Sequence, residues 1–349
     1  VHFLSDIVSE KYESARETVR AFINAPKKEE IIFTAGATAS INAVAFSFGE
    51  KYVREGDEII VSEMEHHANI VPWQMLCGRK NAVLKVIPFT DEGVLDLEAY
   101  RGLITDRTRI VAVTHASNVL GTVNPVKEIV AHAHRHGIPV LVDGAQSIQH
   151  GVVDVSDIDC DFFVFSGHKV YGPNGIGVLY GKEKLMNDLP PYQGGGDMVA
   201  TVSFRKTTWN ELPFKFEAGT TNFTGAIALA AALDYLTALG REAVAEREQS
   251  LLERATAGLS SLRGLRIYGT APRKVSVVSF LPGDIHQYDA GMILDKLGIA
   301  VRTGTHCAQP VMERFGISGT IRASIAFYNT EEEIDALVKG VRKVTEMFD

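Results

Sequence analysis

The sequence predicts an α/β fold, with a large, mostly parallel sheet flanked by helices and a smaller C-terminal α+β domain. Helical and extended patterns alternate through the first two-thirds of the chain, which is the order of elements in a doubly wound sheet. The extended stretches are continuous runs of valine, isoleucine, leucine and phenylalanine, as expected for strands that helices cover on both faces. After Gly240 the pattern changes to a long charged helix followed by short strands.

We expect residues 1–238 to form the large domain. Apolar residues at helical spacing predict helices at residues 9–24, 41–53, 71–80, 95–104, 126–137 and 225–240. Short apolar runs predict strands at residues 29–34, 57–63, 82–89, 108–117, 138–145, 160–168 and 175–181. Ligands of such sheets bind beyond the carboxyl ends of the strands, so the residues that follow each run are site candidates.

Residues 239–349 are expected to form the small domain. A charged helix is predicted at residues 241–262, with further helices at 289–298 and 331–348 and strands at 265–269, 275–282, 299–307 and 320–328. The chain has 349 residues, which is long enough for two domains of ordinary size.

Composition and charge narrow the function classes. The chain is 46% hydrophobic and 22% charged, as in a globular protein with a core, and its net charge of −8 argues against nucleic acid or an anionic membrane as a partner. No apolar run reaches the roughly 18–20 residues of a membrane span. Three widely spaced cysteines, Cys77, Cys160 and Cys307, match neither a disulfide framework nor a zinc motif, so we expect a reducing cytoplasm.

Small residues at positions 35–40 lie between a predicted strand and a helix. Such a turn exposes backbone N–H groups at a helix N-terminus, where a phosphate binds well, and Thr38 adds a hydroxyl. Taken alone, the pattern favours an ordinary helix cap over a phosphate site. The glycine motifs of dinucleotide and nucleoside triphosphate sites are missing from this stretch.

Histidines occur in two groups. His66 and His67 follow a predicted strand, and because neighbouring side chains point in different directions, we expect one of them to face a site, where a neutral imidazole can stack on an aromatic ligand. Metal binding is not favoured, because no partner stands at helical spacing. The alternating histidines His132, His134 and His136 are explained by the dipole at a helix C-terminus.

Charged residues end two of the most apolar strands. Asp143 follows a buried run, where an unpaired carboxylate needs a cationic partner. Ser166, His168 and Lys169 end the next run, and a lysine in so apolar a setting is a candidate for an amine of lowered pKa that forms a Schiff base with an aldehyde. A phosphate cradle, a stacking imidazole, a carboxylate and such a lysine are together what pyridoxal 5′-phosphate (PLP) requires.

At this point the chain resembles a known family. The segments MEHHANIVPWQ, THASNVLGTVNP, VDGAQS, DFFVFSGHKVYGPNGIGVLY, FEAGTTN, RTGTHCAQP and IRASIAFYNT are similar to those of fold-type I PLP enzymes of the class V aminotransferase group. Within that group the chain is most similar to the SufS-like (group II) cysteine desulfurases. The resemblance extends over essentially the whole chain.

The resemblance implies a role for each matching residue. It assigns Lys169 to the cofactor Schiff base, Asp143 to the pyridinium nitrogen, Gln146 to the ring hydroxyl, and His66 to stacking and proton transfer. It assigns Thr38, Ser166 and His168 to the phosphate, with Thr220 reaching the phosphate of a partner subunit. It assigns Asn118, Arg302 and Arg322 to the substrate, whose carboxylate a guanidinium fork matches.

Cys307 falls at the catalytic cysteine of the family, whereas Cys77 and Cys160 occur in apolar contexts typical of buried small side chains. Many relatives carry a histidine where Thr305 stands, so the group that activates Cys307 is left open. The family continues upstream of the position of Val1, so we expect further residues before it in the full protein.

The implied activity is cysteine desulfuration by a cytoplasmic homodimer. L-cysteine would yield L-alanine, and the sulfur would pass as a persulfide on Cys307 to an acceptor of SufE or SufU type for iron–sulfur cluster assembly. Three alternatives remain: a selenocysteine lyase, an aminotransferase of the same fold, and a catalytically silent scaffold protein.

Overall fold

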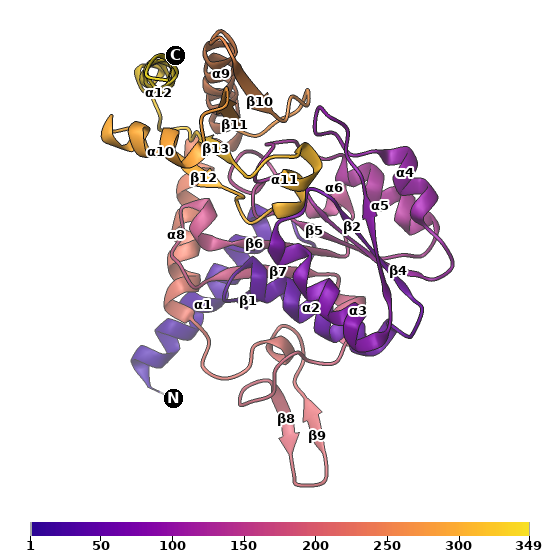
Figure 1. The fold of residues 1–349 in the computed structure, drawn as a ribbon. Helices are drawn as coiled ribbons and strands as arrows, with labels where there is room; N and C mark the ends of the chain where they lie inside the picture. Colours follow the sequence, from indigo (N-terminus) through magenta and orange to yellow (C-terminus); the bar gives the residue numbers. More distant parts are fainter. Residues whose placement is uncertain (1, 349) are drawn as a thin grey trace.

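The computed structural model describes residues 2–348, and its largest element is a seven-stranded sheet (Figure 1). The strands are β1 (Ile31–Thr34), β2 (Glu58–Ser62), β3 (Val83–Ile87), β4 (Thr108–Thr114), β5 (Val140–Asp143), β6 (Phe162–Ser166) and β7 (Gly177–Gly181). Their order in the sheet is β1-β7-β6-β5-β4-β2-β3. Strand β7 runs opposite to the other six strands, which are parallel to one another, and this confirms the mostly parallel sheet.

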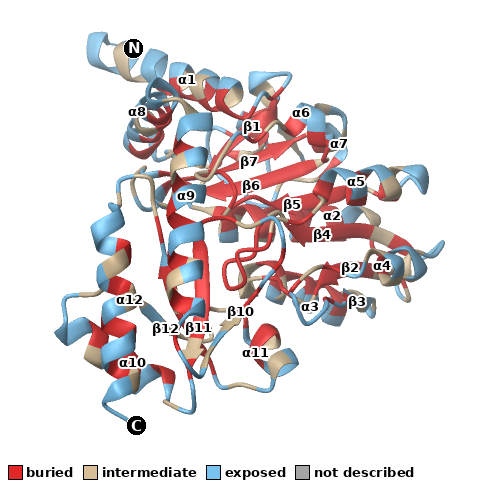
Figure 2. Cartoon of the chain, turned by 90° about the horizontal axis from the view of Figure 1, so that it is seen from above, coloured by how far each residue is buried: buried red, intermediate tan, exposed pale blue. Residues whose placement is uncertain are grey.

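Helices cover both faces of this sheet, as the continuous apolar strands predict (Figure 2). Alternate residues of one strand enter different cores: in β4, Val111 and Val113 contact one apolar cluster and Ile110 and Ala112 contact the other. The helices that precede Gly240 are α1 (Phe3–Phe22), α2 (Ala37–Tyr52), α3 (Val71–Lys80), α4 (Leu97–Leu103), α5 (Val126–Arg135), α6 (Val155–Ile158), α7 (Glu183–Asp188) and α8 (Phe223–Leu239).

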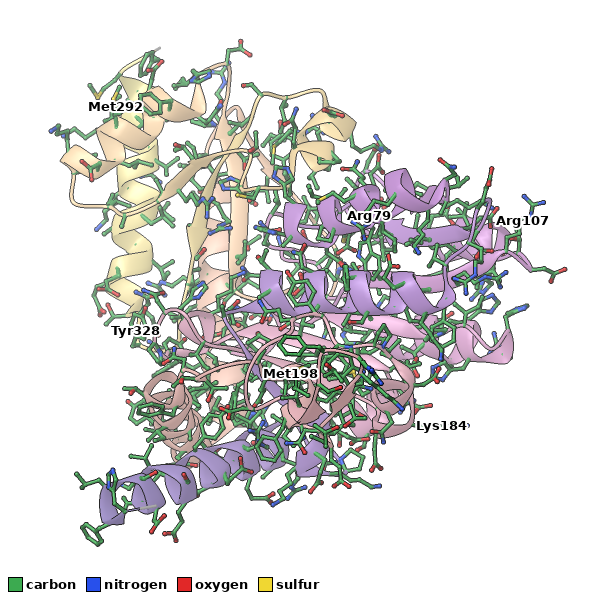
Figure 3. The ribbon with its side chains drawn as sticks, turned by 90° about the horizontal axis from the view of Figure 1, so that it is seen from below. Arg79, Arg107, Lys184, Met198, Met292 and Tyr328 are labelled. Atoms are coloured by element: carbon green, nitrogen blue, oxygen red, sulfur yellow. The ribbon has the colours of Figure 1, made fainter. Side chains whose placement is uncertain are left out.

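A second, four-stranded antiparallel sheet forms the C-terminal part. It has the order β10-β11-β13-β12, from β10 (Leu265–Tyr268), β11 (Val277–Pro282), β12 (Arg302–Gly304) and β13 (Thr320–Ser324). The helices α9 (Arg241–Ser260), α10 (Gln287–Lys296) and α12 (Glu331–Glu346) share its apolar core. Met292 lies on the exposed outer side of α10 (Figure 3).

The chain bends sharply where the sequence pattern changes. Gly240 has a φ of 85° between α8 and α9, and the two helices meet at 77°. This bend supports the predicted division near residue 239, which stays a prediction. Within residues 2–348 no single helix is long and apolar enough to cross a membrane; α8 and α9 meet that criterion only when joined as this bent pair.

Several short elements were not predicted. An exposed hairpin of β8 (Val199–Val202) and β9 (Thr207–Trp209) projects from the body at the end opposite α10 and α12 (Figure 1). The helix α11 (Gln309–Phe315) and four 3₁₀ turns, η1 (Lys28–Glu30), η2 (His67–Asn69), η3 (Gly167–Val170) and η4 (Phe214–Phe216), are also new. The predicted strand 299–307 is longer than β12, which begins at Arg302 and ends at Gly304, where a φ of 108° interrupts the extended backbone.

Candidate active site

The candidate site lies at the carboxyl ends of the parallel strands, where the sequence places it. Asp143 is the last residue of β5 and is buried, and Lys169 follows the neighbouring strand β6 in η3. Burial raises the pKa of the Asp143 carboxyl, and the Lys169 ammonium opposes that shift. Burial lowers the pKa of Lys169, with Asp143 and Cys307 opposing and Arg322 and Arg302 adding to the effect. These five side chains therefore share one electrostatic environment.

His66 belongs to the same cluster. Its ring Nδ1 accepts the N–H of Ala68 at 3.0 Å, which fixes the ring in a turn beside Lys169. Burial, chiefly, and the nearby Lys169, Arg302 and Arg322 lower its pKa to about 4. The imidazole is therefore neutral at neutral pH, as stacking on an aromatic cofactor requires.

An open helix N-terminus lies beside Ser166. The N-cap of α2, Gly36, has a φ of 148° and no capping side chain, and the Ala37 N–H donates to Ser166 Oγ at 2.9 Å. A Cβ on Gly177 would stand 2.4 Å from the Gly36 Cα, so only glycine fits there. Because α2 begins at Ala37 rather than at residue 41, Thr38 lies in its first turn and is exposed. The turn fits a phosphate group.

The predicted substrate residues come from both sheets. Arg322 of β13 donates from Nη1 to the backbone oxygen of Asn118 at 2.8 Å, while its buried Nε has no acceptor among the described residues. Burial and Arg302 lower the pKa of Arg322 to about 10. Asn118 in turn donates from Nδ2 to the backbone oxygen of His306 at 2.7 Å. A guanidinium with an unused buried donor fits a carboxylate ligand.

The Arg302 guanidinium contacts the Cys307 thiol. Its Nη2 lies 3.6 Å from Cys307 Sγ. The thiol is half-buried, whereas Cys77 and Cys160 are buried as predicted. Thr305 contributes a backbone oxygen that accepts the Ala308 N–H at 3.0 Å. Arg302, which the sequence predicts as a substrate ligand, therefore lies beside the thiol.

Two residues at the site were missed from the sequence. Glu65 is fully buried and accepts hydrogen bonds from Ser62, Asn69 and the Thr114 backbone. Its pKa is raised to about 8, chiefly by burial. The signal was present, because Glu65 follows an apolar strand just as Asp143 does. The second is His67, which accepts a hydrogen bond from Gln309 in the loop that carries Cys307.

The remaining predicted residues lie around this cluster or apart from it. His168 is exposed, and burial and Lys169 lower its pKa. Gln146 accepts a hydrogen bond from Gln149 at 3.4 Å. Thr220 is exposed, and its side chain has no hydrogen-bond partner within the part of the chain that the structure describes.

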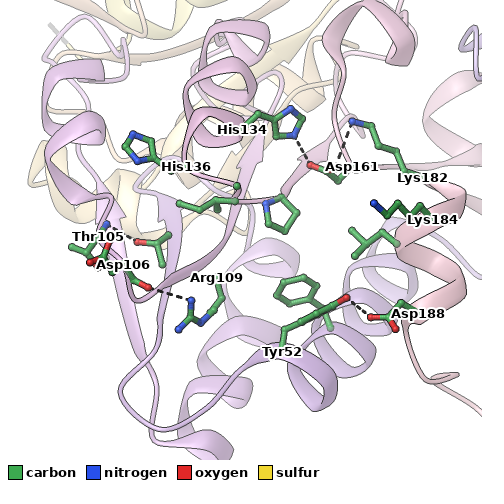
Figure 4. Close-up of a pocket in the computed structure, with 16 residues that line it drawn as sticks. Tyr52, Thr105, Asp106, Arg109, His134, His136, Asp161, Lys182, Lys184 and Asp188 are labelled. Atoms are coloured by element: carbon green, nitrogen blue, oxygen red, sulfur yellow. Dashed lines mark hydrogen bonds and ion pairs between the residues drawn. The ribbon is translucent and has the colours of Figure 1, made fainter.

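Other features lie outside the candidate site. A cavity of about 830 Å³ at the amino ends of β4 and β5 is lined by Arg109, His134, Asp161 and Lys182, and it contains none of the predicted site residues (Figure 4). His134 bonds Asp161 there at 2.8 Å, so that pair is a structural contact. No group of three or more metal-ligating side chains occurs within residues 2–348.

Comparison with known proteins decides the family. A family model described as aminotransferase class-V matches residues 1–337. The chain belongs to this family. It is 52% identical over 345 residues to a cysteine desulfurase of Escherichia coli O7:K1, covering 99% of this chain and 85% of that protein.

Solved structures agree with this assignment. The cysteine desulfurase CsdA from Escherichia coli is 41% identical, with a TM-score of 0.94 over 99% of this chain and 88% of that one. The cysteine desulfurase from Thermococcus onnurineus NA1 is 39% identical, with a TM-score of 0.96 over 99% of this chain and 86% of that one. The predicted fold-type I architecture is thereby confirmed.

Pyridoxal 5′-phosphate is the cofactor of this class-V aminotransferase site, and the residues present fit it. Asp143 is buried with one described hydrogen-bond partner, the Ala145 N–H at 3.0 Å, which leaves carboxylate lone pairs for a ring N–H. The α2 N-terminus would hold the phosphate, and Lys169 the aldehyde.

Proposed function

We propose that this chain is a cysteine desulfurase that converts L-cysteine to L-alanine and captures the sulfur as a persulfide on Cys307. The observation that carries the proposal is the position of the Cys307 thiol, which contacts Arg302 and shares the electrostatic environment of Lys169 and Arg322. An aminotransferase reaction does not require a thiol at this position. A catalytically silent scaffold would not require Lys169, Asp143 and Cys307 together.

In the proposed reaction, each side chain has a distinct role. Arg322 and Asn118 hold the substrate carboxylate, and Lys169, whose pKa burial lowers, takes the proton from Cα and returns a proton to the product. Bound PLP supplies the electron sink that makes this proton acidic. The Cys307 thiolate attacks the substrate sulfur; the sulfur–sulfur bond forms as the carbon–sulfur bond breaks toward carbon, which takes up a proton to give alanine.

We further propose a SufS-type homodimer. Support comes from the β8–β9 hairpin, whose Phe204, Val202 and Trp209 are exposed apolar side chains, and from Thr220, which is exposed in the single chain. A second copy of the chain is the partner that both features fit, with Thr220 reaching the phosphate across the interface. A SufE- or SufU-like acceptor and cytoplasmic iron–sulfur assembly are proposals that rest on the similarity alone.

The test uses purified protein, PLP and L-cysteine, with and without reductant, and measures alanine and sulfide together. Cys307→Ala should abolish persulfide on the protein and reduce sulfide release to background, while Cys77→Ala, the control at a buried thiol, should match the native protein. Native rates of sulfide release from Cys307→Ala would sink the persulfide mechanism.

Selenocysteine lyase remains the second candidate, although no separate feature of the site favours it over the desulfurase. Cysteine desulfuration requires the Cys307 thiol, whereas selenocysteine cleavage need not depend on it. A Cys307→Ala variant that keeps its rate on selenocysteine and loses its rate on cysteine would identify a lyase activity in the same site.

A further inference from the structure

The turn that carries Cys307 has an unfavourable backbone. His306 and Cys307 both have left-handed conformations, with φ values of 54° and 58°. Non-glycine residues rarely adopt this conformation, and two in succession persist only where surrounding contacts hold them. Some part of the molecule therefore fixes this turn.

Three hydrogen bonds join the turn to loops of the large sheet. The His67 N–H donates to the Cys307 backbone oxygen at 2.7 Å, and the Gln309 N–H donates to His67 Nε2 at 3.1 Å. Asn118 Nδ2 donates to the His306 backbone oxygen at 2.7 Å. His67 thus forms hydrogen bonds with Cys307 and with Gln309, the two residues that flank Ala308.

The two flanks of the turn belong to different cores. On one side β12 pairs with β13 in the small sheet. On the other side Ala308, Val311 and Met312 are buried in the apolar cluster of the large domain. The thiol therefore stands where the chain crosses from one core to the other, and small shifts between them act on this turn.

We propose that His67 is a positioning residue that holds the strained Cys307 turn against the large domain, and so keeps the thiol near Lys169 and Arg322. The inference deepens the proposed function and rests on it for its catalytic meaning. His66 and His67 then have separate tasks: His66 lies beside Lys169, and His67 accepts a hydrogen bond from the loop of the nucleophile.

The experiment measures how fast iodoacetamide alkylates Cys307 in the full chain, followed by peptide mass spectrometry. His67→Leu removes the acceptor of the Gln309 N–H, whereas the amide oxygen of His67→Gln can replace Nε2. His136→Leu, at an exposed histidine of the remote cavity, is the matched control. The buried Cys77 and Cys160 are internal controls for unfolding.

Loss of one such hydrogen bond changes a local equilibrium by about fivefold. We expect His67→Leu to speed alkylation of Cys307 by about that factor, and His67→Gln and His136→Leu to stay within about twofold of the native rate. Equal rates in His67→Leu and the native protein, or equal acceleration in His67→Leu and His67→Gln, would overturn the proposal.

A second measurement connects the turn to the reaction. With L-cysteine, His67→Leu should form less persulfide per molecule of bound PLP, and its visible cofactor absorbance should match that of the native protein. Native persulfide yield in this variant would also overturn the positioning role. The alkylation rates do not depend on whether Cys307 captures sulfur, so failure of the clamp and failure of the desulfurase proposal are distinguishable.

Discussion

Lys169 is surrounded by groups with opposing effects on its charge. Burial, Arg322 and Arg302 favour the neutral amine, while Asp143 and Cys307 favour the ammonium. If Arg322 holds the substrate carboxylate as proposed, that anion reduces the repulsion of any positive charge on the lysine. The proposed function therefore predicts that substrate binding and proton transfer are electrostatically coupled at Lys169.

The Arg322 guanidinium gives the first prediction at the residue scale. Arg322→Lys keeps the charge but loses the planar fork and its free Nε donor. Since a charge-assisted hydrogen bond contributes about 1.5–3 kcal/mol, kcat/KM for L-cysteine should fall by roughly 10- to 100-fold. Arg314→Lys, in an exposed ion pair with Asp91, is the matched control and should change little. A native kcat/KM in Arg322→Lys would remove this residue from the substrate site.

Glu65 predicts a pH dependence of stability. Its pKa is raised from 4.5 to about 8, chiefly by burial, so between these values the folded protein keeps a proton that the unfolded chain has released. The contribution of Glu65 to the free energy of unfolding therefore falls as pH rises from about 4.5 to about 8, and is constant outside that window. Glu65→Gln does not titrate, so its stability relative to the native protein should increase across the same window.

Urea unfolding at a series of pH values measures this difference. Only the change of this stability difference with pH tests the raised pKa of Glu65. Its absolute value does not, because the glutamine amide also alters the hydrogen bonds with Ser62 and Asn69. If the difference in unfolding free energy between the two proteins does not change from pH 5 to pH 8, the Glu65 carboxyl is not protonated in the folded protein.

At the scale of elements, the N-terminal helix α1 is fastened to the loop before Thr220 by a buried ion pair. Arg16 is fully buried and bonds Glu217 at 2.7 Å, and Glu217 also accepts the Tyr12 hydroxyl and the Phe33 N–H of β1. Burial alone lowers the pKa of Arg16, but the contacts with Glu217 raise it overall. One carboxylate thus joins a helix, a strand and a loop.

Removal of one partner of this pair should be costly. Arg16→Met leaves Glu217 buried without its cation, and breaking such a pair costs about 3–5 kcal/mol of unfolding free energy. Arg20→Met, in the exposed pair with Glu17 on the same helix, should cost less than about 1 kcal/mol. Urea unfolding at one protein concentration gives both values, and equal losses in the two variants would show that burial of the pair is unimportant.

At the scale of the whole molecule, the proposed dimer predicts complementation. Lys169→Ala damages its own site, whereas Thr220→Asp should repel the phosphate in the partner's site. A mixed dimer then has one intact site and one doubly damaged site, so random pairing should restore roughly a quarter of the native activity.

The control mixture pairs two defects of the same subunit's site. Lys169→Ala with Asp143→Ala leaves one defect in each site of a mixed dimer, so activity should stay at the level of the separate variants. If the Thr220→Asp mixture also stays there, Thr220 does not reach across an interface.

Much of this fold could be read from the sequence because its signals are local. The apolar runs of β4 to β7 and the helical spacing of α5 and α8 identify these elements without tertiary information. The β8–β9 hairpin escaped because its strands are short and exposed, with little apolar alternation. The end of β12 at Gly304, where φ is 108°, escaped because a glycine within an extended run does not by itself show where the strand ends.

The site was predictable to the extent that its residues follow strands. Asp143, Ser166 and Lys169 do so, and the structure brings Asp143 and Lys169 together. The proximity of Arg302 to Cys307 was not predictable, because it depends on a turn rather than on a periodic element. Likewise, His67 and Cys307 are far apart in sequence, and no spacing rule connects them.

The antiparallel pairing of β1 with β7 has a consequence for biosynthesis. Ile31 pairs with Tyr180, so the partner of β1 is synthesised 149 residues after β1 itself (180 − 31). At the usual 5–20 residues per second of translation, this interval is roughly 7–30 s. During that time the glycine turn at residue 36 lacks Gly177 opposite it, and α1 lacks α8 to cover it. The segment from α1 to β1 thus keeps apolar surface exposed while the ribosome completes the sheet.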